Sequence, residues 1–243
     1  MTLKRQGLPC SLEDITPPAD ALALLHRDDA VLSTVKVTAD PDRREQRGTI
    51  TIHSNDPDTP SWTLDVVAGQ KPLASGDTAP DFTLQLLGKK AKVTLSEQCK
   101  EKPVVLTFGS YTCPPFRRAL EGMEDVYKAH KEDCNFLFVY VKEAHASDGW
   151  VSGGNVAQGI EIKQHKTYEE RSGAAKTCQG KLEISMPILI DSLDDATAKQ
   201  YGGVPNRAYL IAKGGKVIYK GDRGPMGTRP DQVKAAIEEL LAE

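Results

Sequence analysis

The sequence predicts an α/β protein in which helices flank a central mixed sheet, preceded by a small β-rich segment. Short apolar runs, an amphipathic stretch after residue 113 and a glycine turn between two late apolar runs support this class. The 243 residues are 39% hydrophobic and 27% charged, as is typical of a soluble globular protein. The net charge of -3 argues against a general nucleic-acid binder. No apolar run approaches the roughly 18 residues of a membrane span.

Residues 1–70 form the predicted β-rich segment. Three stretches alternate apolar and polar residues, at 35–38, 48–53 and 62–67, and a turn signal occupies 54–60. The run around this turn resembles the last hairpin of immunoglobulin-like modules in bacterial envelope and secreted proteins. Since three strands are too few for a complete sandwich, we expect a truncated module or one whose first half lies upstream.

The start of the chain bears on where the protein acts. Residues 1–7 include basic side chains but no apolar stretch follows them, so no signal peptide is expected. The sequence as written therefore predicts a cytoplasmic protein, whereas a truncated start would be consistent with an envelope or secreted one. Residues 70–79 are expected to be a linker, and residues 71–243 the main domain.

The first half of the main domain opens with a hairpin formed by 82–86 and 91–95. A buried strand at 104–108 precedes a helix with one apolar face. The residues of that face are Phe116, Leu120, Met123, Tyr127 and His130. An apolar strand at 136–141 is followed by a long insertion at 142–159.

The second half contains a helix near 164–176, a strand at 187–190 and a hairpin formed by 207–211 and 216–219. A closing helix from Pro230 is expected to bury its apolar residues. Those residues are Val233, Ile237, Leu240 and Leu241. A βαβ unit, a crossover, a ββ hairpin and a helix make a thioredoxin-like, redoxin-type arrangement. Folds of this kind hold a cis proline before the hairpin, and Pro205 occupies that position.

Cys113 is the main candidate for chemistry. It lies between the 104–108 strand and the amphipathic helix, and Pro114 suits the first helical turn. The free N–H groups and dipole of a helix N-terminus favour a thiolate over a thiol. We therefore expect a nucleophilic thiolate there, helped by Arg117 or Arg118 if one of the two faces the sulfur.

The other cysteines show no disulfide or metal pattern. The five cysteines are Cys10, Cys99, Cys113, Cys134 and Cys178. They include no Cys-X-X-Cys pair, and neither cysteines nor histidines show zinc-ligand spacing, so no bound metal or cofactor is expected. Cys134 is expected to be a buried hydrophobe, and Cys99 an inert surface or loop thiol.

The residues around Cys113 resemble a narrower family. The run 108–116, Phe-Gly-Ser-Tyr-Thr-Cys-Pro-Pro-Phe, resembles the active-site segment of the iodothyronine deiodinases, which usually carry selenocysteine where this chain has Cys113. Resemblance continues through 139–150, with Glu-Ala-His-Ala-Ser-Asp-Gly-Trp, and through 162–171. The closing hairpin at 205–225 also matches, so the resemblance spans roughly residues 78–242.

The resemblance implies reductive removal of iodine from an aromatic phenol, as in thyroxine 5'-deiodinase activity. Cys113 would attack the iodine, while His145 and His165 would hold the phenol oxygen and manage the proton. Histidine titrates near neutral pH and suits that task. Arg207 would grip the amino-acid end of the substrate, since arginine clamps carboxylates. Glu143 is expected to orient His145.

The remaining expectations concern the rest of the site and its partners. Trp150 and Pro205 are expected to contribute to substrate binding with Arg207 and Glu143. Cys178 is either a resolving thiol or a helix-end cysteine without a role. Tyr111 and Met186 replace family cysteines, so an external dithiol, thioredoxin or glutathione is the expected reductant. Relatives dimerise, so a homodimer is an open expectation.

Two rival functions stay open. Ser110, three residues before Cys113, is similar to the Ser/Thr that activates peroxide in peroxiredoxins, although Leu106 stands where that family has proline. A general disulfide reductase is disfavoured, because Phe116 occupies the position of the second thioredoxin cysteine. The immunoglobulin-like segment is also consistent with a non-catalytic binding domain of an envelope protein.

Overall fold

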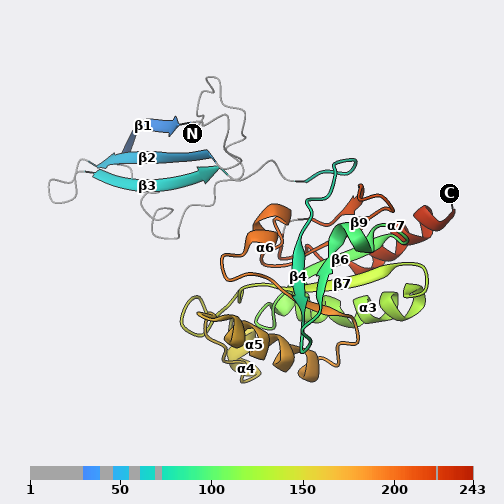
Figure 1. The fold of residues 1–243 in the computed structure, drawn as a ribbon. Helices are drawn as coiled ribbons and strands as arrows, with labels where there is room; N and C mark the ends of the chain where they lie inside the picture. Colours follow the sequence, from blue (N-terminus) through green and yellow to red (C-terminus); the bar gives the residue numbers. More distant parts are fainter. Residues whose placement is uncertain (1–29, 39–45, 55–60, 69–72, 223, 243) are drawn as a thin grey trace. The chain divides into compact units, whose positions relative to one another are not determined.

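The computed structural model describes residues 30–38, 46–54, 61–68, 73–222 and 224–242 (Figure 1). The chain divides into two compact units, Met1–Pro72 and Leu73–Glu243. No helix in the described ranges has both the length and the apolar character needed to cross a membrane.

The first unit contains an antiparallel three-stranded sheet in the order β1-β2-β3. Its strands are β1 (Ala30–Thr38), β2 (Gln46–Ser54) and β3 (Ser61–Ala68), so each predicted strand exists and is longer than its alternating core. Most of the predicted turn, residues 55–60, lies outside the described residues, as does Cys10. The likeness of this first unit to an immunoglobulin module stays a prediction.

The second unit contains a seven-stranded mixed sheet in the order β10-β9-β6-β7-β8-β4-β5. The strands are β4 (Thr83–Leu86), β5 (Lys92–Thr94), β6 (Val104–Gly109), β7 (Asn135–Tyr140), β8 (Ile188–Ile190), β9 (Arg207–Ile211) and β10 (Val217–Lys220). The central strands β6, β7 and β8 are parallel, and the other pairings are antiparallel. This is the thioredoxin-like sheet that the element order predicted.

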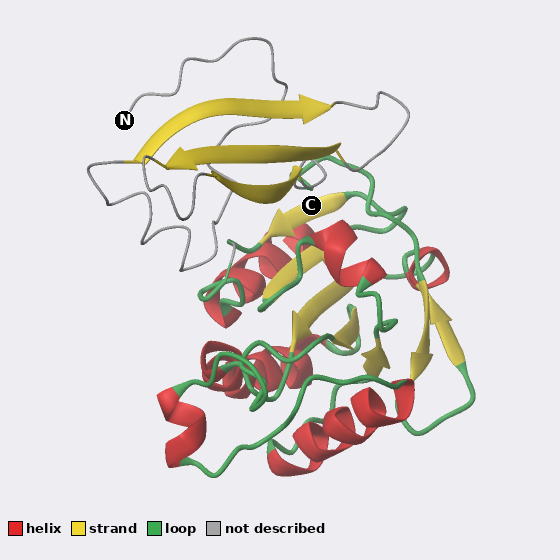
Figure 2. Cartoon of the chain, turned by 90° about the vertical axis from the view of Figure 1, so that its left-hand side faces the viewer, coloured by secondary structure: helices red, strands yellow, loops and turns green. Residues whose placement is uncertain are grey.

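Helices pack on both sides of this sheet (Figure 2). They are α2 (Leu95–Gln98), α3 (Pro114–His130), α4 (Gly153–Ala157), α5 (Tyr168–Lys181), α6 (Ala196–Tyr201) and α7 (Pro230–Ala242). The strand pleat distributes the core between the two faces, because successive side chains point in opposite directions. In β7, Phe136, Phe138 and Tyr140 join the cluster under α3, α5 and α7. Leu137 and Val139 join the cluster that includes α2 and α6.

Two sequence expectations about helices need correction. The helix expected near 164–176 begins at Tyr168, because Thr167 and Glu170 form a capping box that fixes its start. The insertion expected at 142–159 contains the short helix α4, about which the sequence made no prediction. Leu241 is 48% exposed and not part of the core, whereas Val233 and Ile237 are fully buried as predicted.

The predicted linker also needs correction. The backbone N–H of Gly76 donates to Val217, and that of Ala79 donates to Gly215. Thr78 forms a β-bridge with Lys216. Residues 76–79 are therefore attached to the β9–β10 hairpin and belong to the second unit.

Candidate active site

Cys113 immediately precedes α3, at the carboxyl end of β6, and Pro114 occupies the first helical position as predicted. Its backbone is extended, with φ -91° and ψ 103°. Gly109 ends the strand, and a Cβ there would lie 2.4 Å from the Phe116 ring. Glycine therefore lets the first turn of α3 pack directly against β6, which fixes the sulfur at the edge of the sheet.

The protonation preference of Cys113 differs from the prediction. Cys113 is only 1% exposed, and this burial raises the pKa of its thiol. The N–H of Phe116, the amide of Asn206 and the charges of Arg117 and Arg118 act in the opposite direction without cancelling it. The expected thiolate at rest is therefore wrong: the helix start favours the anion, but desolvation dominates. Both arginines lower the pKa of Cys113, although Arg118 is exposed.

The loop before β9 brings a second polar group to the sulfur. The Val204–Pro205 peptide bond is cis, as predicted. The next residue, Asn206, is buried, and its Nδ2 lies 3.4 Å from the Cys113 sulfur. The same Nδ2 donates to the carbonyl of Pro225 at 3.0 Å. The sequence did not single out Asn206, and its position directly after the expected cis proline was the only local signal.

Glu143 is a buried carboxylate attached to the residue before Cys113. Its Oε2 accepts from the backbone N–H of Thr112 at 3.1 Å and from the Thr112 hydroxyl at 2.5 Å. Its Oε1 accepts from the Tyr140 hydroxyl at 2.5 Å and lies 3.1 Å from Nε2 of His165. Burial alone would raise the pKa of Glu143, but His165, Thr112 and Tyr140 together hold it below its ordinary value. The site therefore contains a buried negative charge.

The position of Glu143 corrects one prediction. Its carboxylate contacts His165 and not the ring of His145, which the sequence spacing had suggested. A link to His145 exists only through Thr112, whose hydroxyl oxygen accepts the His145 backbone N–H at 3.2 Å. Glu143 thus fixes the position of the loop that carries His145.

His165 is fully enclosed, with its side chain 2% exposed. Its Nδ1 accepts from Nε of Arg171 at 3.3 Å, because the Arg171 Nε can only donate. In this arrangement the ring proton is on Nε2, which faces Glu143. Arg171 is itself fixed by Asp195 at 2.9 Å and by the carbonyl of Ser192 at 2.6 Å. The position of Arg171 therefore determines the tautomer of His165.

His145 occupies the more open side of the site and is partly exposed. Its ring packs edge-on against Trp150 with centroids 4.5 Å apart, and its Nδ1 lies 3.3 Å from the Trp150 carbonyl. Since a carbonyl only accepts, Nδ1 carries the proton in the neutral ring, and Nε2 is left as an acceptor. Trp150 is 78% exposed, so its contact with His145 lies at the protein surface.

Arg207 is buried at the start of β9. Its Nε donates to the carbonyl of Asp222 at 3.1 Å, and its Nη1 donates to the carbonyl of Tyr201 at 3.2 Å. A Cβ at Gly202 would lie 2.6 Å from this Nη1, so glycine admits the guanidinium to the end of α6. These bonds give Arg207 a structural position between α6 and the closing hairpin. A role for Arg207 in substrate binding stays a prediction.

The other described cysteines are buried. Cys178 lies on α5, is fully buried, and has its pKa raised by that burial and by Glu143. Cys134 is buried as predicted, but Cys99 is also buried and not a surface thiol. Burial raises the pKa of each to about 11. Among the described cysteines, only Cys113 combines a helix N-terminus, an amide donor and two nearby cations.

Helix α4 is tied to the Cys113 segment by a contact that the sequence gave no reason to expect. Asn155 is fully buried, and its Nδ2 donates to the carbonyl of Thr112 at 2.9 Å. Its Oδ1 accepts from Nη1 of Arg117 at 2.9 Å, and the same Nη1 donates to the carbonyl of Tyr111 at 2.6 Å. The insertion is therefore hydrogen-bonded to residues on either side of Cys113 in the chain.

Comparison with known proteins decides the family. The sequence model described as "Iodothyronine deiodinase" matches residues 59–241, which is most of the chain. The chain belongs to the iodothyronine deiodinase family. Its type I relative from Xenopus laevis is 34% identical over 138 residues, covering 57% of this chain and 52% of that protein. A thyroxine 5-deiodinase from Sparus aurata is 33% identical over 165 residues, covering 68% and 60% respectively. The chain thus spans little more than half the length of these deiodinases.

Solved structures agree with the deiodinase-family assignment at the level of the fold. An uncharacterised conserved protein from Geobacillus kaustophilus superposes with a TM-score of 0.51 at 18% identity, covering 70% of this chain and 82% of its own. A thiol:disulfide interchange protein from Bacteroides sp. gives 0.50 at 18% identity, covering 70% and 92%. At such low identity these matches show the thioredoxin-like fold alone.

Proposed function

We propose that this protein removes iodine reductively from an iodinated phenol, with Cys113 as the nucleophile. The sulfur attacks the iodine, so that an S–I bond forms as the C–I bond breaks. The bonding pair stays on the ring carbon, which takes up a proton. An external thiol then attacks the sulfur and releases iodide, and a second thiol frees Cys113 as the external disulfide forms. Overall, two thiols are oxidised and one C–I bond is reduced to C–H.

The observation that carries the proposal is the network joining Cys113 to a buried carboxylate and histidine. Glu143 accepts two hydrogen bonds from Thr112, the residue before Cys113, and its Oε1 lies 3.1 Å from Nε2 of His165. The carboxylate and the histidine are therefore attached to the Cys113 segment. His165 carries a proton on Nε2 in this pair, and we assign to it the proton that the ring carbon requires. His145, with Nε2 as an acceptor in its neutral ring, is suited to hold the phenol hydroxyl.

The burial of Cys113 fits a small electrophile. A residue that is 1% exposed is poorly placed to attack a disulfide on another folded protein. A single iodine atom projecting from a ring requires far less room. Phe116, in the position of a second thioredoxin cysteine, packs against Phe138 with ring centroids 4.9 Å apart and supplies no thiol. Re-reduction is therefore assigned to a thiol from solution.

The rival peroxidase function has less support. The Ser110 side chain is fully buried, and its hydroxyl oxygen accepts the backbone N–H of Ala144 at 3.2 Å. This bond links the Cys113 loop to the Glu143 loop, which is a structural task. Peroxide consumption by Cys113 is nevertheless a direct alternative outcome of the assay below.

The test is iodide release from 3,5-diiodotyrosine or an iodothyronine by purified protein with dithiothreitol. We expect release by the unmodified protein and by Cys134→Ser, a buried cysteine outside the network, and none by Cys113→Ser. Hydrogen peroxide replaces the iodinated compound in a parallel reaction. Peroxide consumption without iodide release would overturn the proposal, and absence of both would favour a binding domain.

A further inference from the structure

The carboxylate of Asp195 is not used in the way that its position in the chain suggests. Asp195 immediately precedes α6, and its backbone is left-handed, with φ 55°. An aspartate before a helix usually accepts hydrogen bonds from the first N–H groups of that helix, but Asp195 makes no such bond. Asp191 accepts from the N–H groups of Thr197 and Ala198 instead, at 3.2 and 2.9 Å. Capping of α6 therefore does not account for the Asp195 side chain.

The partners of the Asp195 carboxylate are two cations. Its Oδ1 lies 2.9 Å from Nη2 of Arg171, and its Oδ2 lies 3.9 Å from Nζ of Lys142. The side chain of Asp195 is 12% exposed and that of Arg171 only 2%, so their ion pair is largely removed from solvent. Removing one member of a buried pair leaves the other charge uncompensated. The carboxylate is therefore committed to Arg171.

These contacts close a cycle around Glu143 and His165. Nε of Arg171 donates to Nδ1 of His165 at 3.3 Å, and Nε2 of His165 lies 3.1 Å from Glu143. Lys142 precedes Glu143 in the chain, so Asp195 also contacts the residue beside Glu143. That second contact is the weaker one, because the Lys142 side chain is 44% exposed. Asp195 thus restrains the pair mainly from the side of His165.

The orientation of the Arg171 guanidinium decides which nitrogen of His165 carries the proton. Nη1 of Arg171 donates to the carbonyl of Ser192 at 2.6 Å, whereas Nη2 faces Asp195. These two contacts fix the plane of the guanidinium and hence the direction of its Nε. Since Nε can only donate, the facing Nδ1 of His165 must present a lone pair, and the proton stays on Nε2.

We propose that Asp195 is a positioning residue for the reaction at Cys113, because through Arg171 it keeps the proton of His165 on Nε2. The inference rests on the proposed function, which assigns that proton to the ring carbon. If Asp195 only shaped the turn before α6, glycine could replace it, since glycine adopts a φ of 55° readily. Glycine cannot replace a carboxylate that positions Arg171.

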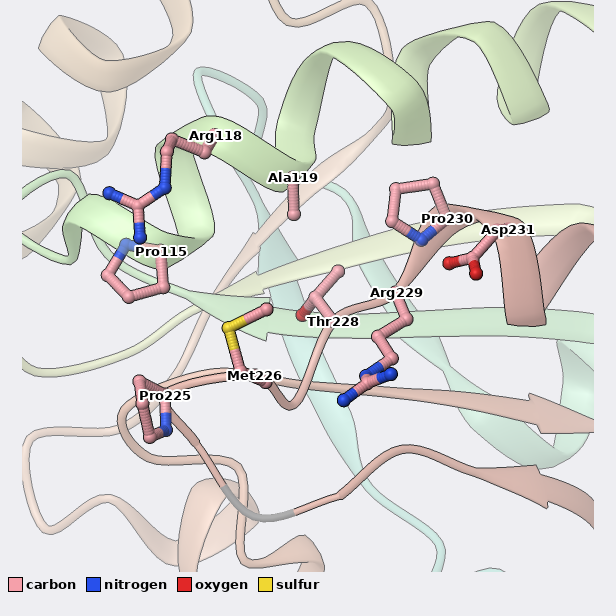
Figure 3. A pocket seen from close by; sticks show the side chains of 9 residues that line it. All are labelled: Pro115, Arg118, Ala119, Pro225, Met226, Thr228, Arg229, Pro230 and Asp231. Carbon is pink, nitrogen blue, oxygen red and sulfur yellow. The ribbon is translucent and has the colours of Figure 1, made fainter.

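The test compares Asp195→Gly and Asp195→Asn in the full-length protein, since glycine and asparagine both tolerate a left-handed backbone. Asp231→Asn is the matched control. Asp231 is an exposed carboxylate in the first turn of α7, in the lining of a pocket of about 310 Å³ between α3 and the segment 225–231 (Figure 3). Circular dichroism checks that each variant folds, and if one Asp195 variant does not fold, the other decides.

The readout is nitrogen NMR of protein labelled at its histidines, near pH 8, where a histidine with the ordinary pKa of about 6.5 is neutral. His165→Gln identifies the signals of His165. In the unmodified protein and in Asp231→Asn, Nδ1 of His165 should give a pyridine-type signal and Nε2 a pyrrole-type signal. In both Asp195 variants the two signals should move toward each other, because the two tautomers mix.

The same variants are assayed for iodide release. The kcat of both Asp195 variants should fall about tenfold or more, as part of the roughly 100-fold to 10,000-fold that proton transfer contributes. The KM should stay within about twofold, because Asp195 acts through Arg171 and His165 and not by binding the substrate.

Unchanged His165 signals in both Asp195 variants would overturn the inference, as would an equal change in Asp231→Asn. A normal kcat in an Asp195 variant whose tautomers mix would also overturn it, because the reaction would then not depend on the position of the proton. If the unmodified protein releases no iodide, the proposed function fails, while the NMR signals still decide whether Asp195 fixes the tautomer of His165.

Discussion

The side-chain amide of Asn206 lies 3.4 Å from the sulfur of Cys113. An amide N–H stabilises a thiolate more than a thiol, so this contact lowers the pKa of Cys113 against the larger effect of burial. Burial therefore favours the thiol form of Cys113 at rest, while groups already in position stabilise its anion. The reactivity of Cys113 depends on the balance between burial, which raises its pKa, and these groups, which lower it.

Replacing Asn206 tests the balance. Asn206→Ala removes the donor, so the pKa of Cys113 rises further and alkylation by iodoacetamide at pH 8 slows by up to about tenfold, the factor for one pKa unit. Rates measured from pH 7 to 10 give the midpoint of the profile. Asn135→Ala, which removes an amide bound to the carbonyl of Gln98, is the control. An unchanged midpoint in Asn206→Ala would contradict the assignment.

Glu143 predicts a pH dependence of stability. Its pKa is lowered in the folded protein, so its contribution is present above the unfolded value of about 4.3 and is lost as pH falls through the folded value. Glu143→Gln keeps the shape but removes the charge, and it should cost about 1–3 kcal/mol at pH 7. Urea unfolding between pH 3 and 7 should show a flatter profile for Glu143→Gln than for the unmodified chain. Parallel profiles would show that the carboxylate is not ionised as described.

Asn155 predicts a mechanical link between α4 and the active site. Asn155→Ala removes the donor to the Thr112 carbonyl and the acceptor for Arg117. Amide exchange in 111–117 and 153–158 should therefore accelerate together. Val156→Ala, on the same helix but 68% exposed, should leave both segments unchanged. Acceleration confined to 153–158 would mean that α4 is not coupled to the Cys113 segment.

Cys178 allows a test of how Cys113 is re-reduced under the proposed function. Because its thiol is fully buried and its pKa is raised, Cys178→Ala should leave iodide release with dithiothreitol within about twofold of normal. Mass spectrometry after one turnover without reductant should find no Cys113–Cys178 disulfide. Detection of that disulfide, or loss of turnover in Cys178→Ala, would identify Cys178 as the resolving thiol.

Much of the sheet and its helices could be predicted, because apolar runs and turn residues carry local signals. The run 136–140 in β7 is apolar throughout since both faces of the sheet are covered there. Helix α6 begins at Ala196 and has only six residues, too few to show an amphipathic period. Helix α4, with five residues, is likewise too short to show such a period.

The residue types of the site could be predicted, but not their pairing or their energetics. Glu143 and His165 are 22 positions apart, so only the packing of α5 and its preceding loop brings them within 3.1 Å. The pKa of Cys113 was predicted from the helix N-terminus, a local feature, whereas burial by the surrounding core decides its direction. Asn206 and Asn155 act through tertiary contacts that have no sequence period.

The most direct test of the central claim is a single turnover in D2O without reductant. Reduced protein in excess over 3,5-diiodotyrosine should yield ring-deuterated monoiodotyrosine, with one Cys113 oxidised for each molecule of product and none formed by Cys113→Ser. Cys134→Ser should match the unmodified protein. Equal product from Cys113→Ser, or oxidation of Cys113 without any loss of iodine from the ring, would contradict the account.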